Sequence, residues 1–258
     1  MTLQRLRSVV TTVLLWTYFM GAFVAGYWVV FLVAGVARGR RGIAWALGHY
    51  ARVFFAVVRL AVPGLRFTLP EREHLHRIRG SVVVCNHLSF LDPLLLLSLL
   101  PSLITIVRPS FFRVPIFGWL LRGAGFLGPD LFAEGSAWIA RVERHLRKAG
   151  NLLIFPEGTR SRDGRLAPFK KGAFYLAKHL AAPIVVLRVF GTHRLFPPGH
   201  FAFETSAGQV IEVREIATID VASAADATTY ELTARVRSLL DAPSSPTSPA
   251  RTRPMRPT

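Results

Sequence analysis

The stretch Ser81–Leu95, which reads SVVVCNHLSFLDPLL, constrains the fold more than any other part of the chain. Its first five residues form a short β-branched run, which predicts a buried strand of an α/β domain. Asn86 ends this run, and Asp92 with the proline after it precedes an apolar segment. We therefore expect Asp92 to cap a helix whose first turn accepts the proline. His87 then lies in the connection between the strand and the helix.

His87 and Asp92 are five positions apart, a spacing that does not align two side chains on a regular helix face. A bent connection can instead fold the carboxylate back onto the imidazole Nδ1–H. That contact would set the tautomer and leave Nε2 free to act as a base. The alternative is a solvated loop histidine beside an ordinary N-cap aspartate, and this stretch alone does not decide between the two.

A second stretch, Asn151–Ser161 (NLLIFPEGTRS), again runs from an apolar strand into a polar turn. Ligands of α/β folds bind where strands end in this way. Glycine in the turn lets the backbone approach a ligand closely, an arginine can hold phosphate in fork geometry, and hydroxyls add further contacts. The residues concerned are Glu157, Gly158, Thr159, Arg160 and Ser161. Glu157 has the alternative role of a salt-bridge partner for a local arginine.

A histidine and an aspartate separated by four residues, with Phe155–Arg160 (FPEGTR) about seventy positions later, resemble the motifs of the glycerolipid acyltransferase family. The archetype of that family is 1-acylglycerol-3-phosphate acyltransferase. The resemblance continues at Phe169–Ala173 and Ala182–Val186 and covers roughly Leu65 to Phe203. It implies an α/β fold with a mainly parallel sheet flanked by helices, preceded by membrane-associated helices.

The resemblance also implies an activity. A fatty acyl group would pass from an acyl thioester, either acyl-CoA or acyl-acyl carrier protein, to the free hydroxyl of a lysophospholipid. The acceptor would be 1-acylglycerol-3-phosphate, giving phosphatidic acid in phospholipid biosynthesis. His87 would remove the hydroxyl proton and Asp92 would stabilise the imidazolium. The implied substrate-binding residues are Glu157, Gly158, Thr159, Arg160, Arg108 and Lys170.

Several alternatives remain beside these assignments. Arg108 can be a surface arginine, and Lys170 can belong to a solvated basic turn with Lys171. Cys85, two residues before His87, can form an acyl-enzyme and make the protein a thioesterase or a ping-pong transferase. We favour a core role for Cys85, because it continues a buried strand with no activating cation nearby in sequence. A degenerate domain that only binds lipid is the non-enzymatic alternative.

The chain departs from the family in one block, usually written Gly-x-x-Phe-x-x-Arg. Here that frame reads Gly123, Phe126 and Pro129, with Asp130 following. In the family this arginine is associated with the phosphate of the acceptor. Its absence leaves the acceptor open to another lysolipid or hydroxyl-bearing lipid.

Composition narrows the partners. The 258 residues suffice for one large catalytic domain, which we assign to residues 64–242. Lys and Arg number 32 against 15 acidic residues, a formal charge of +17, which favours an anionic partner such as anionic lipid or an acidic carrier protein. We expect no nucleic acid partner, because 51% of the chain is hydrophobic and no nucleic-acid-binding motif appears. We expect no metal or other cofactor, because neither a Cys/His ligand cluster nor a nucleotide-binding glycine loop appears.

The N-terminal residues 1–63 predict membrane attachment. Val9–Val36 carries no charge over 28 residues, so as a helix it would span a bilayer with tilt or bend back at Gly21, Gly26 or Gly35. A cleaved signal peptide is the alternative. Arginines are more numerous after this segment than before it, which favours a cytoplasmic C-terminal side, a catalytic domain facing the cytosol and attachment to the cytoplasmic membrane. The single cysteine fits that reducing side.

Ile43–Val62 predicts an amphipathic helix. Arg41, Gly48, His49, Arg52 and Arg59 form one stripe, and apolar residues occupy the other face. The helix can lie among lipid headgroups or pack against the domain core, and the pattern does not choose between them.

The remaining periodicities predict a series of further elements. We expect strands at Leu65–Leu69, Pro183–Phe190 and Gly208–Val213. We expect helices at Leu94–Leu100, Ala137–Ala149 with Gly150 as the C-cap, Phe174–Leu180 and Asp226–Asp241. Pro70–Gly80 is expected to be a polar linker, and residues 243–258 a disordered basic tail.

Overall fold

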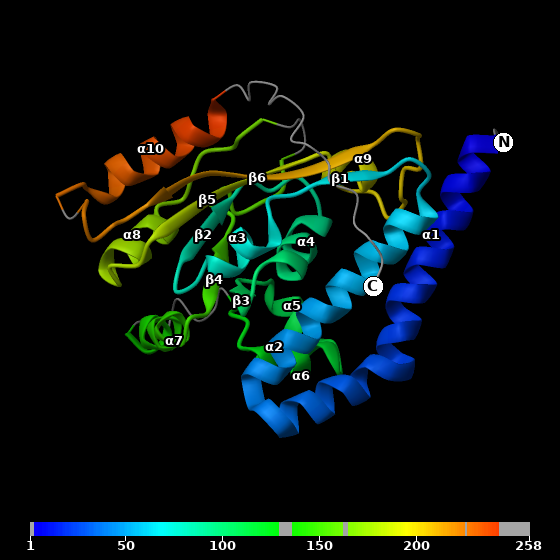
Figure 1. The fold of residues 1–258 in the computed structure, drawn as a ribbon, viewed down its shortest axis with the longest axis horizontal. Coiled ribbons are helices and arrows are strands. Elements are labelled where there is room, and N and C mark those ends of the chain that lie inside the picture. The colour runs from blue at the N-terminus through cyan, green and yellow to red at the C-terminus, as the bar shows by residue number, and fades with distance from the viewer. Residues whose placement is uncertain (1–2, 129–135, 162–164, 225, 243–258) are drawn as a thin grey trace.

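The computed structural model describes residues 3–128, 136–161, 165–224 and 226–242. These residues form a six-stranded sheet in the order β1-β6-β5-β2-β4-β3, with helices on both sides (Figure 1). Four of the five neighbouring strand pairs are parallel, and β5 with β6 is antiparallel. This confirms the predicted α/β fold with a mainly parallel sheet. The strands are β1 (Arg66–Thr68), β2 (Val82–Cys85), β3 (Leu103–Thr105), β4 (Asn151–Ile154), β5 (Ile184–Phe190) and β6 (Val210–Ile219).

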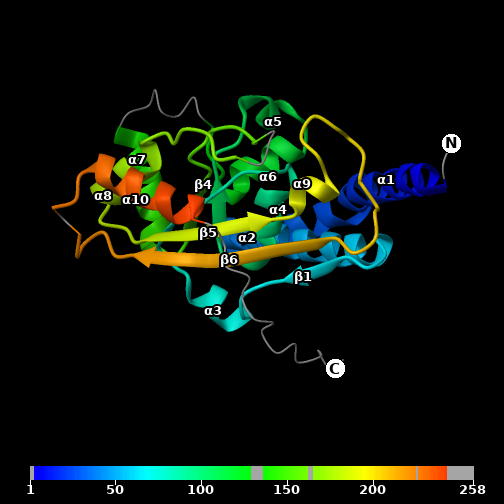
Figure 2. The same ribbon diagram turned by 90° about the horizontal axis from the view of Figure 1, so that it is seen from above.

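Helices cover the sheet because its central strands are apolar on both faces. Every residue of β2 is buried, as the β-branched run predicts. Figure 1 shows α10 on one side of the sheet and α2 with α4 on the other, and Figure 2 agrees from above. The helices that follow β1 along the chain are α3 (Arg72–Arg77), α4 (Leu91–Leu99), α5 (Pro109–Arg113), α6 (Phe117–Ala124), α7 (Ser136–Arg147), α8 (Gly172–His179), α9 (Thr192–Leu195) and α10 (Thr229–Asp241).

The parallel pairs determine where a site can form. Strands β2, β4 and β5 point in the same direction, so their carboxyl ends meet at one edge of the sheet. The polar residues that follow β2 and β4 in sequence are thereby brought together, and so is the segment after β5. This edge is where ligands of α/β folds bind.

The N-terminal region is a bent helical pair rather than one straight helix. It consists of α1 (Leu3–Ala22), a π-helical segment η1 (Phe23–Tyr27) and α2 (Trp28–Ala61), with non-helical backbone at Gly39. Of the three predicted bend positions, Gly26 lies in the π-helical segment. The bend at Gly39 was not predicted. Glycine tolerates the φ of +56° at position 39. Gly42 also has to lack a side chain, because a Cβ there would lie 1.8 Å from the Ala34 carbonyl oxygen.

Helix α1 packs against the domain that contains the sheet. Arg7 and Ser8 hydrogen bond to Thr205, and the indole N–H of Trp16 donates to the carbonyl of Phe201 at 2.9 Å. Leu15 is buried in the common core. The assignment of residues 1–63 to a separate anchoring unit therefore stays a prediction.

The second half of α2 resolves the choice left open for Ile43–Val62. Its apolar face is buried against α4 and α6, with Phe54 and Val58 among the most enclosed side chains. Gly48, predicted on the arginine stripe, is also buried, and a side chain there would lie 3.0 Å from the Leu97 carbonyl oxygen of α4. The core-facing alternative is correct for this face. Among the described residues, one helix, α2, is long and apolar enough by length and composition to cross a membrane.

Most of the other predicted elements are present, with two corrections. Pro70–Gly80 is not simply a linker, because it contains α3, which buries Leu75. The left-handed residue after α7 is Ala149 (φ +59°) rather than Gly150. Gly150 is needed for a different reason, since a side chain there would meet the His145 ring at 2.2 Å. The predicted disordered tail, 243–258, lies outside the described residues.

Candidate active site

The predicted contact between His87 and Asp92 is present at the carboxyl end of β2. Nδ1 of His87 lies 2.9 Å from Oδ2 of Asp92. The imidazole stacks on the Phe155 ring, with 4.1 Å between ring centroids and 19° between planes. The His87 side chain is 18% exposed, and Nε2 has no hydrogen-bond partner among the described residues. The ring therefore has one nitrogen held and the other available.

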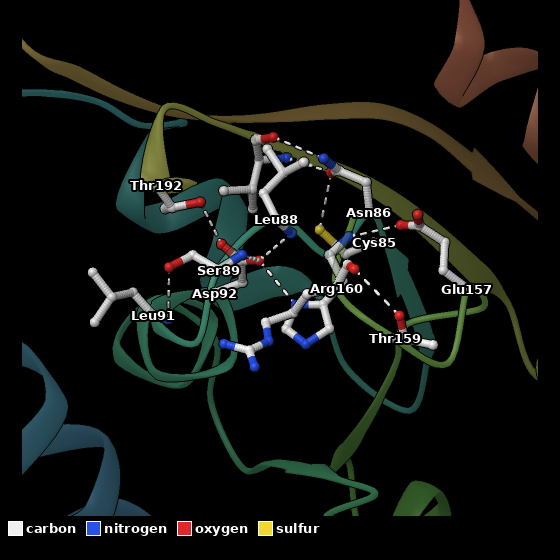
Figure 3. Close-up of polar contacts among 12 residues, drawn as sticks. Cys85, Asn86, Leu88, Ser89, Leu91, Asp92, Glu157, Thr159, Arg160 and Thr192 are labelled. Carbon is white, nitrogen blue, oxygen red and sulfur yellow. Dashed lines mark hydrogen bonds and ion pairs between the residues drawn. The ribbon is translucent and has the colours of Figure 1, made fainter. Parts of the chain in front are cut away.

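Asp92 carries a fully buried carboxylate held by several donors (Figure 3). Oδ2 accepts the backbone N–H groups of Leu88 at 2.6 Å and Ser89 at 2.7 Å, in addition to the imidazole. Oδ1 accepts the Thr192 hydroxyl at 2.5 Å. Burial of a charged group is costly unless such partners are present. The structure thus supplies a complete set of donors for an ionised carboxylate.

The predicted capping role of Asp92 is wrong in detail. Helix α4 begins at Leu91, its N-cap residue is Phe90, and Asp92 is the second helical residue. Its carboxylate turns back to the N–H groups of the connection before the helix rather than to the helix's own first turn. The bent connection therefore forms around the aspartate.

The turn after β4 holds His87 from the other side. Oε1 of Glu157 accepts the backbone N–H of His87 at 2.9 Å, and Oε2 accepts the N–H of Ala167 at 3.1 Å. The backbone N–H of Ser161 donates to the carbonyl of His87 at 2.8 Å. Burial raises the pKa of the Glu157 carboxyl, and the backbone N–H groups of His87 and Ala167 partly oppose that rise. The bonds given for Glu157 within the described residues go to backbone N–H groups and not to an arginine, and the substrate contact stays a prediction.

Arg160, Thr159, Gly158 and Lys170 lie around the same turn. Figure 3 shows the Arg160 side chain, which is half-buried, extending toward the side of the site on which Asp92 lies. Gly158 has a φ of +71°, and a side chain there would meet Nζ of Lys170 at 2.8 Å. Lys170 is exposed and lies over the glycine, while the hydroxyl of Thr159 donates to the carbonyl of Arg160. The side chains of Arg160 and Lys170 thus place two cations at this turn.

Arg108 does not belong to this cluster. Arg108 is the exposed N-cap residue of α5, and in the described part of the chain its side chain makes no hydrogen bond or ion pair. Its predicted role in phosphate binding stays a prediction. Pro129, where the family has arginine, lies outside the described residues.

Cys85 does not have the environment of a nucleophile. It is fully buried at the end of β2, and its thiol donates to the Asn86 side-chain oxygen at 3.6 Å. Burial, followed by the carboxylates of Asp92 and Glu157, raises the pKa of the Cys85 thiol well above its ordinary value. A thiol that stays protonated and enclosed is a poor attacking group.

Sequence reasoning missed three residues that shape the site. Phe155 forms the surface on which the imidazole stacks. Asn86 closes the end of β2 onto β5, because its side chain bonds both the N–H and the carbonyl of Val189. Thr192 reaches Asp92 from the segment after β5. The available signal was the end of the predicted strand 183–190, which a parallel sheet brings to the same edge as His87.

Gly191 makes the Thr192 contact possible. It has a φ of +81°, and a side chain there would lie 1.9 Å from the Val210 carbonyl oxygen of β6. Glycine tolerates both the dihedral angle and the close approach. The chain can therefore turn sharply out of β5 and point the Thr192 hydroxyl at the buried carboxylate.

Among the described residues, no group of three or more His, Cys, Asp or Glu side chains is placed to hold a metal ion. The independence of the reaction from metals and other cofactors stays a prediction.

Comparisons with known proteins find similarity to acyltransferases. A family model described as Acyltransferase matches residues 66–189. The chain is 39% identical over 120 residues to the 1-acyl-sn-glycerol-3-phosphate acyltransferase BAT2, chloroplastic, of Brassica napus, covering 46% of this chain and 35% of that protein. It is 34% identical over 167 residues to the human 1-acyl-sn-glycerol-3-phosphate acyltransferase beta, covering 63% and 60%. The matches thus cover about a third of the first protein and three fifths of the second.

A solved structure shares the fold. The 1-acyl-sn-glycerophosphate (LPA) acyltransferase PlsC of Thermotoga maritima superposes with a TM-score of 0.75 at 20% sequence identity. The superposition covers 93% of this chain and 95% of that one. The N-terminal helices are therefore included in the shared fold.

Thr192 provides a test of the site geometry. Thr192→Val removes the donor to Oδ1 of Asp92 and leaves a buried charged oxygen unpaired, so we expect roughly a tenfold lower kcat in acyl transfer. Thr192→Ser keeps the hydroxyl and should stay within about twofold of the unchanged protein. Equal activity of the two variants would contradict the positioning role.

Proposed function

Because this chain belongs to the glycerolipid acyltransferase family, we propose that it transfers a fatty acyl group from an acyl thioester to the free hydroxyl of a lysophospholipid. The acceptor we propose is 1-acylglycerol-3-phosphate, which would give phosphatidic acid for phospholipid synthesis. The observation that carries the proposal is the His87 imidazole, with Nδ1 on a buried carboxylate and Nε2 unoccupied.

The chemistry follows from that arrangement. Nε2 of His87 takes the proton of the acceptor hydroxyl as its oxygen attacks the thioester carbonyl carbon. The resulting imidazolium is stabilised by the Asp92 carboxylate, whose other donors remain in place. The tetrahedral intermediate then collapses, the carbon–sulfur bond breaks, and the imidazolium returns the proton to the leaving thiolate. The products are an ester and a free thiol.

The acceptor phosphate needs cationic partners near this base. Arg160 and Lys170 flank the turn after β4, and the absence of the family's arginine at position 129 places more weight on them. Guanidinium groups bind phosphate through two parallel hydrogen bonds, so Arg160 is the stronger candidate. Arg108 remains a third candidate.

The donor is proposed only as an acyl thioester. The formal charge of +17 suits an acidic carrier protein and equally suits the phosphates of coenzyme A. Either donor presents the same thioester carbonyl to the site.

We also propose that the helical pair attaches the protein to a membrane. Large apolar side chains of α1 and the first part of α2 are exposed together, and such patches mark contacts with lipid or protein. They are Leu6, Val9, Val10, Val13, Leu14, Met20, Trp28, Val29, Val30, Leu32, Val33 and Val36. Because the opposite side of α1 is bonded to the catalytic domain, lipid would lie beside that domain. The arginines after the apolar run support a catalytic domain on the cytosolic side of the cytoplasmic membrane.

The function is tested by incubating purified protein with a labelled acyl thioester and a panel of lysolipids, with the products identified by mass spectrometry. His87→Ala should lower kcat by roughly a hundred- to ten-thousandfold, because the base is lost. Asp92→Asn should lower kcat less, since the imidazole remains. Cys85→Ala is the control and should keep most of the activity.

Either of two results would contradict this proposal. One is a His87→Ala protein that turns over its best acceptor at the unchanged rate. The other is thioester consumption that needs no acceptor, with label trapped on Cys85.

Arg160 tests the acceptor. Arg160→Ala should raise KM for 1-acylglycerol-3-phosphate and lower kcat/KM by roughly a hundredfold, as expected for loss of a charge-assisted phosphate contact of about 2–3 kcal/mol. Lys171→Ala is the matched control, because Lys171 lies over the Tyr230 ring instead. If the unchanged protein uses this acceptor poorly and prefers a lysolipid without a phosphomonoester, the departure at Pro129 marks a different acceptor.

A further inference from the structure

The connection between α5 and α6 exposes large apolar side chains on the catalytic domain itself. Val114, Ile116 and Trp119 are 48%, 48% and 46% exposed, and they lie within six consecutive positions. Exposed apolar side chains gathered in this way mark a contact with protein or with lipid, whereas scattered ones need no explanation. The segment that carries them, residues 113–119, is termed the α5–α6 tip.

Ile116 has a strained backbone conformation. Its φ is +62° and its ψ is −56°, and the N–H of Phe117 donates to the carbonyl of Pro115 at 2.6 Å. This geometry is the rare, strained form of the γ-turn, and a β-branched residue at positive φ is an outlier. Strained residues of this kind are concentrated at functional sites. Because Ile116 stays exposed in the domain, burial of its side chain in a partner would offset the strain.

The α5–α6 tip is held in place by contacts between the two helices. The N–H of Gly118 donates to the Val114 carbonyl at 2.7 Å. The Arg122 guanidinium donates to the Phe112 carbonyl at 2.7 Å and lies over the Phe112 ring. Gly118 has to lack a side chain, because a Cβ there would lie 2.2 Å from the same carbonyl oxygen. The exposed apolar side chains are therefore presented by a defined turn.

The α5–α6 tip lies beside the helical pair that we propose to attach to a membrane. The ring of Phe117 packs on Phe23 of η1, with 6.0 Å between ring centroids. Met20 and Trp28, which flank Phe23 in sequence, are among the exposed apolar residues of that pair. The two exposed apolar regions are therefore joined through the contact between Phe23 and Phe117.

The charges around the α5–α6 tip favour a lipid surface as its partner. Residues 93–129 contain Arg108, Arg113 and Arg122 but no Asp or Glu. All three arginines are exposed. Apolar side chains bordered by arginines, with a tryptophan among them, match the order of acyl chains and anionic headgroups at a bilayer surface. A soluble protein partner would not explain why the adjacent helical pair exposes apolar side chains as well.

We propose that the α5–α6 tip inserts its apolar side chains into the bilayer, so that the catalytic domain contacts lipid directly, alongside the helical pair. Arg113 would lie among the headgroups. The inference rests on the membrane attachment proposed above and requires no catalytic role for the tip.

Site-specific labelling of the full-length protein tests this contact. Cys85 is the sole cysteine of the chain and is buried, so in a Cys85→Ala background one introduced cysteine can carry a fluorophore. The substitutions are Ile116→Cys at the tip, Val13→Cys on the exposed face of α1, and Tyr230→Cys on α10, which lies away from α1 (Figure 1). Each protein is reconstituted in vesicles of phosphatidylcholine and phosphatidylglycerol, and quenching by acyl-chain nitroxides and by aqueous iodide is measured.

The label at position 116 should behave like the label at position 13, quenched by the nitroxides and protected from iodide. The label at position 230 should show the opposite pattern. A label at 116 that stays open to iodide, while the label at 13 is quenched from the lipid, would overturn the inference and leave the helical-pair attachment standing. Exposure of both labels to iodide would remove that attachment as well.

A second copy of the chain is the other occupant that the labels can reveal. Iodide protection at position 116 that rises with protein density in the vesicles, without nitroxide quenching, would identify a second copy and would also overturn the inference. Acyl transfer to a dispersed lysolipid is measured on the same labelled proteins. Absence of that activity would overturn the proposed function without changing the quenching patterns.

Vesicle partitioning gives an independent measure. Ile116→Asn removes the apolar side chain, and asparagine adopts positive φ more readily than isoleucine, so the unfolding temperature should not fall. This variant should partition into vesicles roughly tenfold less, the loss expected when one large, half-exposed apolar side chain no longer leaves water. Tyr230→Asn is the matched control and should partition as the unchanged protein does. Equal partitioning of the two variants would contradict insertion of the tip.

Discussion

The buried carboxylate of Asp92 is the interaction on which the site depends. A charge with no exposed surface is stable only if the protein replaces its water, and here the donors come from two separate segments. The connection after β2 supplies two backbone N–H groups and the imidazole, and Thr192 after β5 supplies a hydroxyl. Each donor requires its strand to end at the same edge of the sheet. The parallel pairing of β2 with β5 therefore brings the donors of Asp92 together and so orients the imidazole.

The residues that support the connection carrying His87 are different from those proposed to react. Glu157 bonds two backbone N–H groups, Asn86 ties β2 to β5, and Phe155 supports the imidazole ring, so the connection carrying His87 is braced on several sides. Among the described residues, Nε2 of His87 has no hydrogen-bond partner, and the side chain is partly exposed. The cations proposed for the acceptor phosphate lie on the neighbouring turn. In the proposed mechanism, proton transfer and acceptor binding use different residues, so the absence of the family's arginine at position 129 leaves the His87–Asp92 contact unchanged.

Much of this was predictable from local sequence, and the exceptions share a cause. The β-branched run before His87, its spacing to Asp92 and the polar turn after β4 are short-range patterns, and they predicted the strands, the Nδ1 contact and the turn correctly. Thr192 was missed because its role depends on pairing with a strand a hundred residues away. The bend at Gly39 and the docking of α1 were missed for the same reason, since they depend on backbone contacts across the bend and on hydrogen bonds to the distant segment around Thr205. Charge periodicity alone likewise did not show that Gly48 is enclosed.

The tautomer of His87 tests the account most directly. With ¹⁵N-labelled histidine, NMR at neutral pH should show Nδ1 of His87 protonated and Nε2 unprotonated, because Nδ1–H donates to Asp92. Asp92→Asn should change that pattern, since an amide in the same place can offer its own N–H to the ring. A proton found on Nε2 of the unchanged protein, or a tautomer indifferent to the loss of the carboxylate, would contradict the claim that Asp92 prepares this imidazole as the base.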